Sequence, residues 1–175
     1  MRAVVVYESM YGNTHQVADA IGAGLKSVYE VGVLPVADAG SEVLADADLV
    51  VVGGPTHAHG MSRESTRRAA GDAAGKPGSD LTLESEAVHQ GLREWFASLG
   101  QLPAKAAAFD TRIHGPALLT GRASKGIAHL LRQHGCEVVT EPESFLVSRD
   151  NQLDAGETER ARDWAAKLAA DVAAG

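Results

Sequence analysis

The chain has 175 residues, of which 45% are apolar and 22% are charged, and this balance predicts a globular protein with room for a full hydrophobic core. The formal net charge of -7 argues against nucleic acid as a partner, and no apolar stretch is long enough to span a membrane. Because Cys136 is the single cysteine, an intramolecular disulfide is excluded. The first residues enter a strand without a basic-then-apolar leader, so we expect a cytoplasmic protein.

Strand and helix patterns alternate through the first half of the chain. An unbroken apolar run predicts a strand over residues 3–7, buried on both faces, and apolar residues three to four apart predict a helix over 14–29. A second strand is expected over 31–36, followed by a turn at 38–41 and a short helix at 42–46 with Ser41 as its cap. The third strand covers 49–52 and leads into the segment 53–60.

The second half continues the alternation. One or two helical turns are expected at 62–70, and the glycine-rich segment 71–85 reads as a long loop, either functional or mobile. A helix at 86–99 precedes the fourth strand at 105–109, and a helix capped by Ser124 ends at Gly135. The fifth strand begins at 136–140 and continues at 144–147, and the last helix covers 157–173. We assign Trp95, Trp164 and Cys136 to the core.

Five strands alternating with helices predict an α/β, three-layer, doubly wound fold of one domain, residues 1–175. Its five-stranded parallel sheet would have the order 2-1-3-4-5, with helices on both faces. Ligands of such sheets bind outside the carboxyl ends of the strands. The loops that begin at Ser9, Gly53 and Asp110 should therefore converge on one site.

The first of these loops, Ser9-Met10-Tyr11-Gly12-Asn13-Thr14, joins a strand to a helix N-terminus, where unpaired N–H groups and about half a positive charge favour a phosphate. Ser9 and Thr14 add hydroxyl groups, Gly12 permits close approach, and Asn13 tolerates a left-handed backbone. The loop contains no Lys or Arg, so neutral donors would hold the phosphate. It matches neither a P-loop nor a dinucleotide-binding fingerprint. The alternative is an ordinary strand-to-helix turn with a Thr cap.

The same hexapeptide resembles the phosphate loop of flavodoxins, Ser/Thr-x-Thr-Gly-x-Thr, with Tyr11 in place of the usual small hydroxyl residue. Flavodoxin-type quinone reductases and the flavodoxin modules of flavo-diiron proteins are similar in having an aromatic residue there. The segment Gly53-Gly54-Pro55-Thr56 also resembles the Gly-x-Pro-Thr of flavodoxins, where the loop holds the isoalloxazine ring. This resemblance implies a flavodoxin-like fold with FMN as cofactor and no metal. The cofactor-binding residues it implies are Ser9, Met10, Tyr11, Gly12, Asn13, Thr14, Pro55, Thr56, His57, Ala58, His59, Gly60, Asp110, Thr111, Arg112 and Gly115.

Three side chains in these loops are candidates for chemistry. His57 or His59 could stack on a flavin or donate a proton, because the pKa of histidine lies near neutrality. Arg112 could stabilise negative charge on a reduced flavin or on an acidic substrate. The alternatives are solvated loop histidines and an arginine paired with a surface carboxylate.

Three functions remain open at this point. The first is an FMN-binding electron carrier that docks to a redox partner protein through its acidic surface. The second is an FMN-dependent enzyme, similar to a quinone reductase or a flavodoxin-type protoporphyrinogen oxidase, acting on a small quinone-like substrate. The third is a flavin-free interaction module of the same fold. A phosphorylatable receiver domain is disfavoured, because Gly53-Gly54 stand where its Asp would be.

Overall fold

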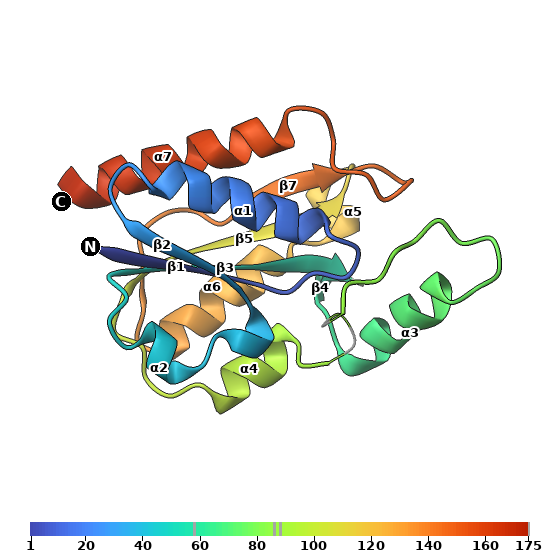
Figure 1. The fold of residues 1–175 in the computed structure, drawn as a ribbon, viewed down its shortest axis with the longest axis horizontal. Coiled ribbons are helices and arrows are strands. Elements are labelled where there is room, and N and C mark those ends of the chain that lie inside the picture. The colour runs from blue at the N-terminus through green and yellow to red at the C-terminus, as the bar shows by residue number, and fades with distance from the viewer. Residues whose placement is uncertain (58, 86, 88, 175) are drawn as a thin grey trace.

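The computed structural model describes residues 1–57, 59–85, 87 and 89–174, and a parallel sheet lies at its centre (Figure 1). Strands β1 (Arg2–Tyr7), β2 (Glu30–Pro35), β3 (Leu49–His57) and β5 (Lys105–Ile113) lie in the order β2-β1-β3-β5. Two short strands, β6 (Glu137–Val138) and β7 (Glu143–Val147), share the fifth position, each parallel to β5. The predicted order 2-1-3-4-5 is confirmed. A short strand that was not predicted, β4 (Gly60–Met61), pairs antiparallel with β3.

Helices cover both faces of the sheet, as the three-layer prediction requires. Helices α1 (Asn13–Leu25) and α7 (Glu157–Ala174) lie on one face, and α2 (Ser41–Leu44), α4 (Leu92–Ser98) and α6 (Ala123–Gln133) lie on the other (Figure 1). Helix α3 (Glu64–Ala74) lies beyond the carboxyl ends of the strands. A 3-10 turn η1 (Val36–Asp38) follows β2, and a short helix α5 (Ala117–Thr120) follows β5. No helix in the described ranges is long and apolar enough to cross a membrane.

The apolar runs of the central strands are buried on both faces. Val4 and Val6 of β1 pack into the cluster under α4 and α6, while Ala3 and Val5 pack into the cluster under α1 and α7. All four side chains are fully buried. Side chains of a strand alternate between faces, so a strand covered by helices on both sides must be apolar at every position. The prediction of a doubly covered central strand is confirmed.

The residues assigned to the core are largely buried. Trp95 is buried and donates its indole N–H to the Ala39 carbonyl at 2.7 Å. Cys136 is also buried, and burial raises the pKa of its thiol. Trp164 is half-buried and meets the ring of Phe145 edge-on, with 6.2 Å between the ring centroids.

Several predicted helix boundaries are wrong. The helix predicted over 14–29 ends at Leu25, because the N–H groups of Val28 and Tyr29 both bond to the Leu25 carbonyl in a tight turn. Tyr29 is nevertheless buried, which prolongs the apolar spacing beyond the helix. The helix expected over 62–70 instead covers Glu64–Ala74, so the loop expected from Gly71 begins at Gly75.

The helix predicted over 86–99 begins at Leu92. Residues 86 and 88 lie outside the described residues, and residues 87 and 89–91 are not helical. The side chain of Glu94 accepts the Gly91 N–H at 3.1 Å and closes the first turn at that point.

The two predicted serine caps are also wrong, since the N-cap residues are Gly40 for α2 and Arg122 for α6. At α6 the Asp110 carboxylate, which comes from β5, accepts the Ser124 N–H at 2.7 Å and takes the place of a local cap.

Candidate functional site

The first loop joins β1 to α1 through a left-handed residue, and that residue is Gly12, with φ +90°. Asn13, which was expected to tolerate the left-handed backbone, is instead the first residue of the helix. Glycine adopts positive φ without a Cβ penalty, so the sharp turn falls on it. The Ser9 hydroxyl accepts the Gly12 N–H at 3.1 Å and closes the loop.

Three contacts with distant parts of the chain brace this loop. The Tyr11 hydroxyl donates to the Ala70 carbonyl of α3 at 3.0 Å. The Met10 carbonyl accepts the Glu84 N–H at 2.9 Å. The Asn13 side-chain amide donates to the carbonyl and side-chain oxygens of Asn151, each at 3.1 Å. The loop is thus held from α3, from the segment after α3 and from the β7–α7 connection.

These contacts do not involve the backbone N–H groups in the loop and at the start of α1. Those of Tyr11, Asn13 and Thr14 form no hydrogen bond with the described residues. The first N–H groups of a helix lack partners within the helix and need an acceptor from outside. An anion placed here would meet several donors together with the positive end of the helix dipole.

Two buried threonine hydroxyls meet beneath the loop. Thr14 Oγ1 and Thr111 Oγ1 are 2.8 Å apart, and the side chains come from α1 and from β5. One hydrogen bond between two hydroxyls uses only one of their two hydrogens. The other hydrogen has no acceptor among the described residues, so the pair can still donate to a ligand.

A cavity of about 200 Å³ opens above this pair at the carboxyl ends of the strands, and we call it the first cavity. It joins parts of the three loops that the sequence predicted to converge. Ile113, Val147 and Asn151 also line it, and no sequence motif pointed to them. The lining residues are Ser9, Met10, Tyr11, Asn13, Thr14, Pro55, Thr56, His57, Thr111, Arg112, Ile113, Val147 and Asn151.

Other predicted site residues lie away from this lining. Asp110 is fully buried, with its carboxylate turned to α6, and burial raises its pKa. Gly115, with φ +151°, lies in the loop after β5. His59 and Gly60 line a neighbouring cavity. Ala58 lies outside the described residues.

Arg112 is held in place by its own loop. Its Nη1 donates to the Gly115 carbonyl at 2.7 Å and to Thr120 Oγ1 at 3.0 Å. No ion pair between described residues includes Arg112, so the alternative of a surface carboxylate partner does not describe its contacts. Its positive charge stands in the wall of the first cavity, and no carboxylate of a described residue forms an ion pair with it.

His57 and His59 differ in their surroundings. His57, at the end of β3, lines both the first cavity and the neighbouring one. Burial, together with the charge of Arg67, lowers the pKa of His57 below its ordinary value, which favours the neutral ring. His59 has a left-handed backbone with φ +73°, and a Cβ placed on Gly121 would lie 2.3 Å from the His59 Cα. Gly121 therefore permits close contact between the two backbones.

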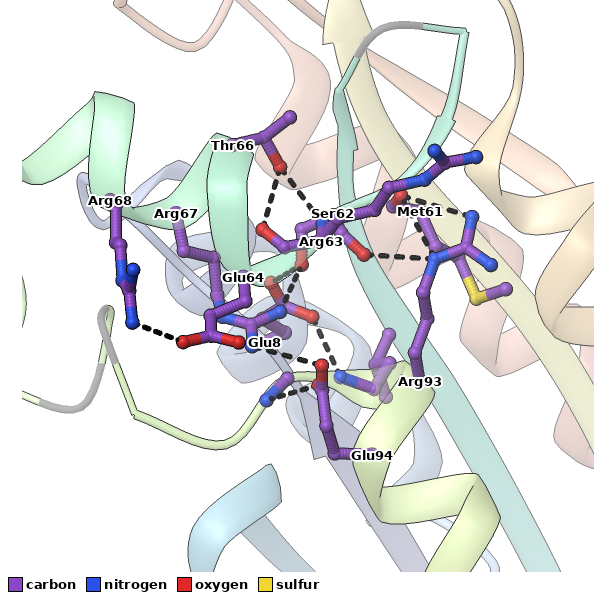
Figure 2. Close-up of polar contacts among 12 residues, drawn as sticks. Glu8, Met61, Ser62, Arg63, Glu64, Thr66, Arg67, Arg68, Arg93 and Glu94 are labelled. Atoms are coloured by element: carbon purple, nitrogen blue, oxygen red, sulfur yellow. Dashed lines mark hydrogen bonds and ion pairs between the residues drawn. The ribbon is translucent and has the colours of Figure 1, made fainter.

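A buried polar cluster lies beside the first loop, and the sequence patterns did not predict it (Figure 2). Glu8 follows β1 and accepts hydrogen bonds from the Ser62 hydroxyl and, at 2.8 Å, from the Leu92 N–H. Arg67 donates to Ser62 Oγ and to Glu94 Oε1, each at 3.1 Å. Burial raises the pKa of Glu8. An acidic residue directly after a buried strand indicates that its carboxylate needs hydrogen-bond donors, but the sequence does not show which distant residues supply them.

The cluster packs tightly against Gly91, where it meets α4. A Cβ on Gly91 would lie 2.3 Å from Arg67 Nη1.

Among the described residues, no group of three or more His, Cys, Asp or Glu side chains could hold a metal ion.

Comparison with known proteins agrees with this architecture. Residues 4–67 match the family model of the flavodoxin domain. A flavodoxin from the domain Archaea is 24% identical, with a TM-score of 0.65 over 98% of this chain and 99% of that chain. Flavodoxin 2 from Bacillus cereus is 21% identical, with a TM-score of 0.63 over 98% of this chain and 99% of that chain.

A longer protein shows the same likeness over part of its length. The flavodiiron protein from Giardia intestinalis is 22% identical, with a TM-score of 0.61 over 99% of this chain but only 36% of that chain. A comparison with curated proteins gave no match. The fold is that of a doubly wound α/β protein, and the first cavity lies at the carboxyl edge of the sheet, where such proteins bind their ligands. More specifically, the fold of this chain is flavodoxin-like, as its motifs predicted.

Proposed function

We propose that the chain binds FMN in the first cavity and transfers electrons through it. The observation that carries the proposal is that the N–H groups of Tyr11, Asn13 and Thr14 have no partner in the part of the chain that the structure describes, in a loop without cationic side chains. A terminal phosphate needs such donors, and neutral donors at a helix N-terminus suffice for it. The likeness to flavodoxins supports the same assignment.

The residues present fit this group at both ends of the cavity. The first loop and the Thr14–Thr111 hydroxyl pair would hold the phosphate. Pro55, Thr56 and His57 would lie against the ring, and Arg112 would stand near negative charge on the reduced cofactor. When bound, FMN supplies the redox chemistry, while the protein sets its position and electrostatics. FMN is preferred to FAD because the loop closes on a single terminal phosphate.

His57 is the side chain best placed to hold or move a proton. Burial and the charge of Arg67 lower its pKa and so favour the neutral ring, in which one nitrogen can donate while the other accepts. It also lines two cavities, so it would be shared by a cofactor bound in one and a second molecule bound in the other.

Titration of the purified protein with FMN and with riboflavin tests the proposal. Flavin fluorescence should be quenched on binding, and FMN should bind at least tenfold more tightly than riboflavin, because charged hydrogen bonds to the phosphate contribute about 1.5–3 kcal/mol each. Equal affinity for the two would place the phosphate outside the loop. No binding of either would reject a flavin function and leave the interaction module.

A second experiment separates the carrier from the enzyme. Steady turnover of the FMN-loaded protein with NAD(P)H and a quinone would reject a pure carrier role. We also propose that residues 1–175 form one domain, which limited proteolysis tests. We further propose that the protein works in the cytoplasm, which cell fractionation tests.

A further inference from the structure

The cavity that shares His57 with the first cavity has an unusual charge for this protein. It has a volume of about 380 Å³, and we call it the arginine cavity. Its described lining includes Arg63 and Arg93 but no Asp or Glu, although the chain as a whole carries a net charge of -7. The lining residues are His57, His59, Gly60, Met61, Arg63, Ser65, Thr66 and Arg93.

Arg93 is fixed against the backbone that forms the floor of this cavity. Its Nε donates to the Ser62 carbonyl at 3.0 Å, and its Nη2 donates to the Met61 carbonyl at 3.3 Å. Carbonyl groups orient the guanidinium without cancelling its charge. No ion pair between described residues includes Arg93, so its charge faces the cavity.

Arg63 adds a second charge on the same side. Figure 2 shows the Arg63 and Arg93 side chains reaching toward one side of the Met61–Arg63 segment. The nearby Arg67 has a different role, because its guanidinium is buried and bonded to Ser62 and Glu94. Two guanidinium groups are thus available to one ligand, and arginine forms strong charge-assisted hydrogen bonds with carboxylates, sulfonates and phosphates.

His57 belongs to the walls of both the arginine cavity and the first cavity, where we propose that FMN binds. A molecule anchored in the arginine cavity and a ligand of the first cavity would therefore share it as a wall residue. An anchor in the cavity next to the proposed cofactor site would select a small molecule by its charged group and leave the rest of it near the cofactor.

We infer that the arginine cavity binds the anionic group of a small molecule that exchanges electrons with the cofactor, and that Arg63 and Arg93 select it. This inference rests on the proposed FMN function. It names the substrate class as oxyanion-bearing redox compounds rather than neutral quinones.

Calorimetric titration of the FMN-loaded protein with 1,4-naphthoquinone-2-sulfonate and with neutral 2-methyl-1,4-naphthoquinone tests the inference. The sulfonate should bind about tenfold more tightly, as one charged hydrogen bond predicts, and the difference should shrink as salt is raised. Arg63→Gln and Arg93→Gln should each remove most of the difference. Arg132→Gln, which removes an exposed charge near the end of α6, is the matched control and should keep it.

Equal binding of the two probes, or an equal loss in Arg132→Gln, would overturn the inference. Because Arg93 also holds backbone carbonyls, Arg63→Gln is decisive if Arg93→Gln fails to fold. The affinity for FMN is measured separately by fluorescence. Normal FMN binding without sulfonate preference rejects only the arginine cavity. Failure to bind FMN rejects the proposed function, and the sulfonate is then titrated into the flavin-free protein, where absence of an Arg63-dependent affinity rejects the cavity as well.

Discussion

Replacing Thr14 by Val tests the phosphate loop most directly, because the two side chains have nearly the same shape and only the hydroxyl is lost. Thr14 is 2% exposed, and its hydroxyl is 2.8 Å from that of Thr111. In the absence of ligand the substitution leaves the Thr111 hydroxyl without its partner, which should lower the free energy of unfolding by about 1–2 kcal/mol.

The effect on ligand binding is separate from this loss. A charged phosphate that loses one hydroxyl donor should bind about 1–3 kcal/mol more weakly, which is roughly 5- to 150-fold in the dissociation constant. Riboflavin has no phosphate, so its affinity should change by less than about twofold on the same reasoning. Calorimetric or fluorescence titrations with both ligands give the comparison, and urea unfolding gives the stability change.

Thr111→Val is the matched control. It removes the other hydroxyl of the pair but leaves the Thr14 hydroxyl free to donate to the phosphate, so FMN affinity should fall less than in Thr14→Val. An equal loss of affinity for FMN and riboflavin in Thr14→Val would mean that the hydroxyl is purely structural, and the reasoning about the loop would be refuted.

Three further predictions concern stability. Gly91→Ala should lower the free energy of unfolding by about 1–3 kcal/mol, because the new Cβ would lie 2.3 Å from Arg67 Nη1. Gly100→Ala is the control: a Cβ there meets no described atom within 4 Å, so the free energy of unfolding in urea should change by less than about 0.5 kcal/mol. Similar urea midpoints for the two variants would contradict the packing argument. Burial raises the pKa of Glu8 in the folded protein above its ordinary value of 4.5. The contribution of this carboxyl to stability is therefore fully present below pH 4.5 and is lost as the pH rises through the folded-state pKa. Glu8→Gln should therefore gain stability relative to the parent with rising pH, and parallel stability curves would reject this. Asn151 has φ +57°, so Asn151→Ala should cost about 1 kcal/mol and Asn151→Gly less, and the reverse order in thermal unfolding would exclude backbone strain as the cause.

The fold was predictable because its strands carry their own signal. A central strand covered on both faces must be apolar throughout, and Val4, Val5 and Val6 meet that requirement in three consecutive letters. Helix ends were less predictable, since apolar spacing records burial and not hydrogen bonding. Tyr29 is buried after α1 has ended, and it continues a pattern that the backbone does not follow.

The candidate site was predictable where one loop supplies its parts and unpredictable where distant residues meet. The loop from Ser9 to Thr14 is contiguous, so its donors could be read directly. The partners of Glu8 lie at Ser62 and Leu92, more than fifty residues away, and nothing local pairs them. Arg63 and Arg93 pose the same problem, because two arginines thirty positions apart become neighbours only when the segment around Met61 folds against α4.

The bracing of the first loop affects what binding would cost. Contacts from Tyr11 to Ala70, from Glu84 to Met10 and from Asn13 to Asn151 fix the loop in the free protein. A ligand that enters a preorganised loop orders little additional chain, so more of its contact energy remains as affinity. Amide hydrogen exchange should then be slow at Gly12, whose N–H bonds to Ser9, before any cofactor is added, and loading the protein should slow exchange mainly at Tyr11, Asn13 and Thr14 by covering their open N–H groups.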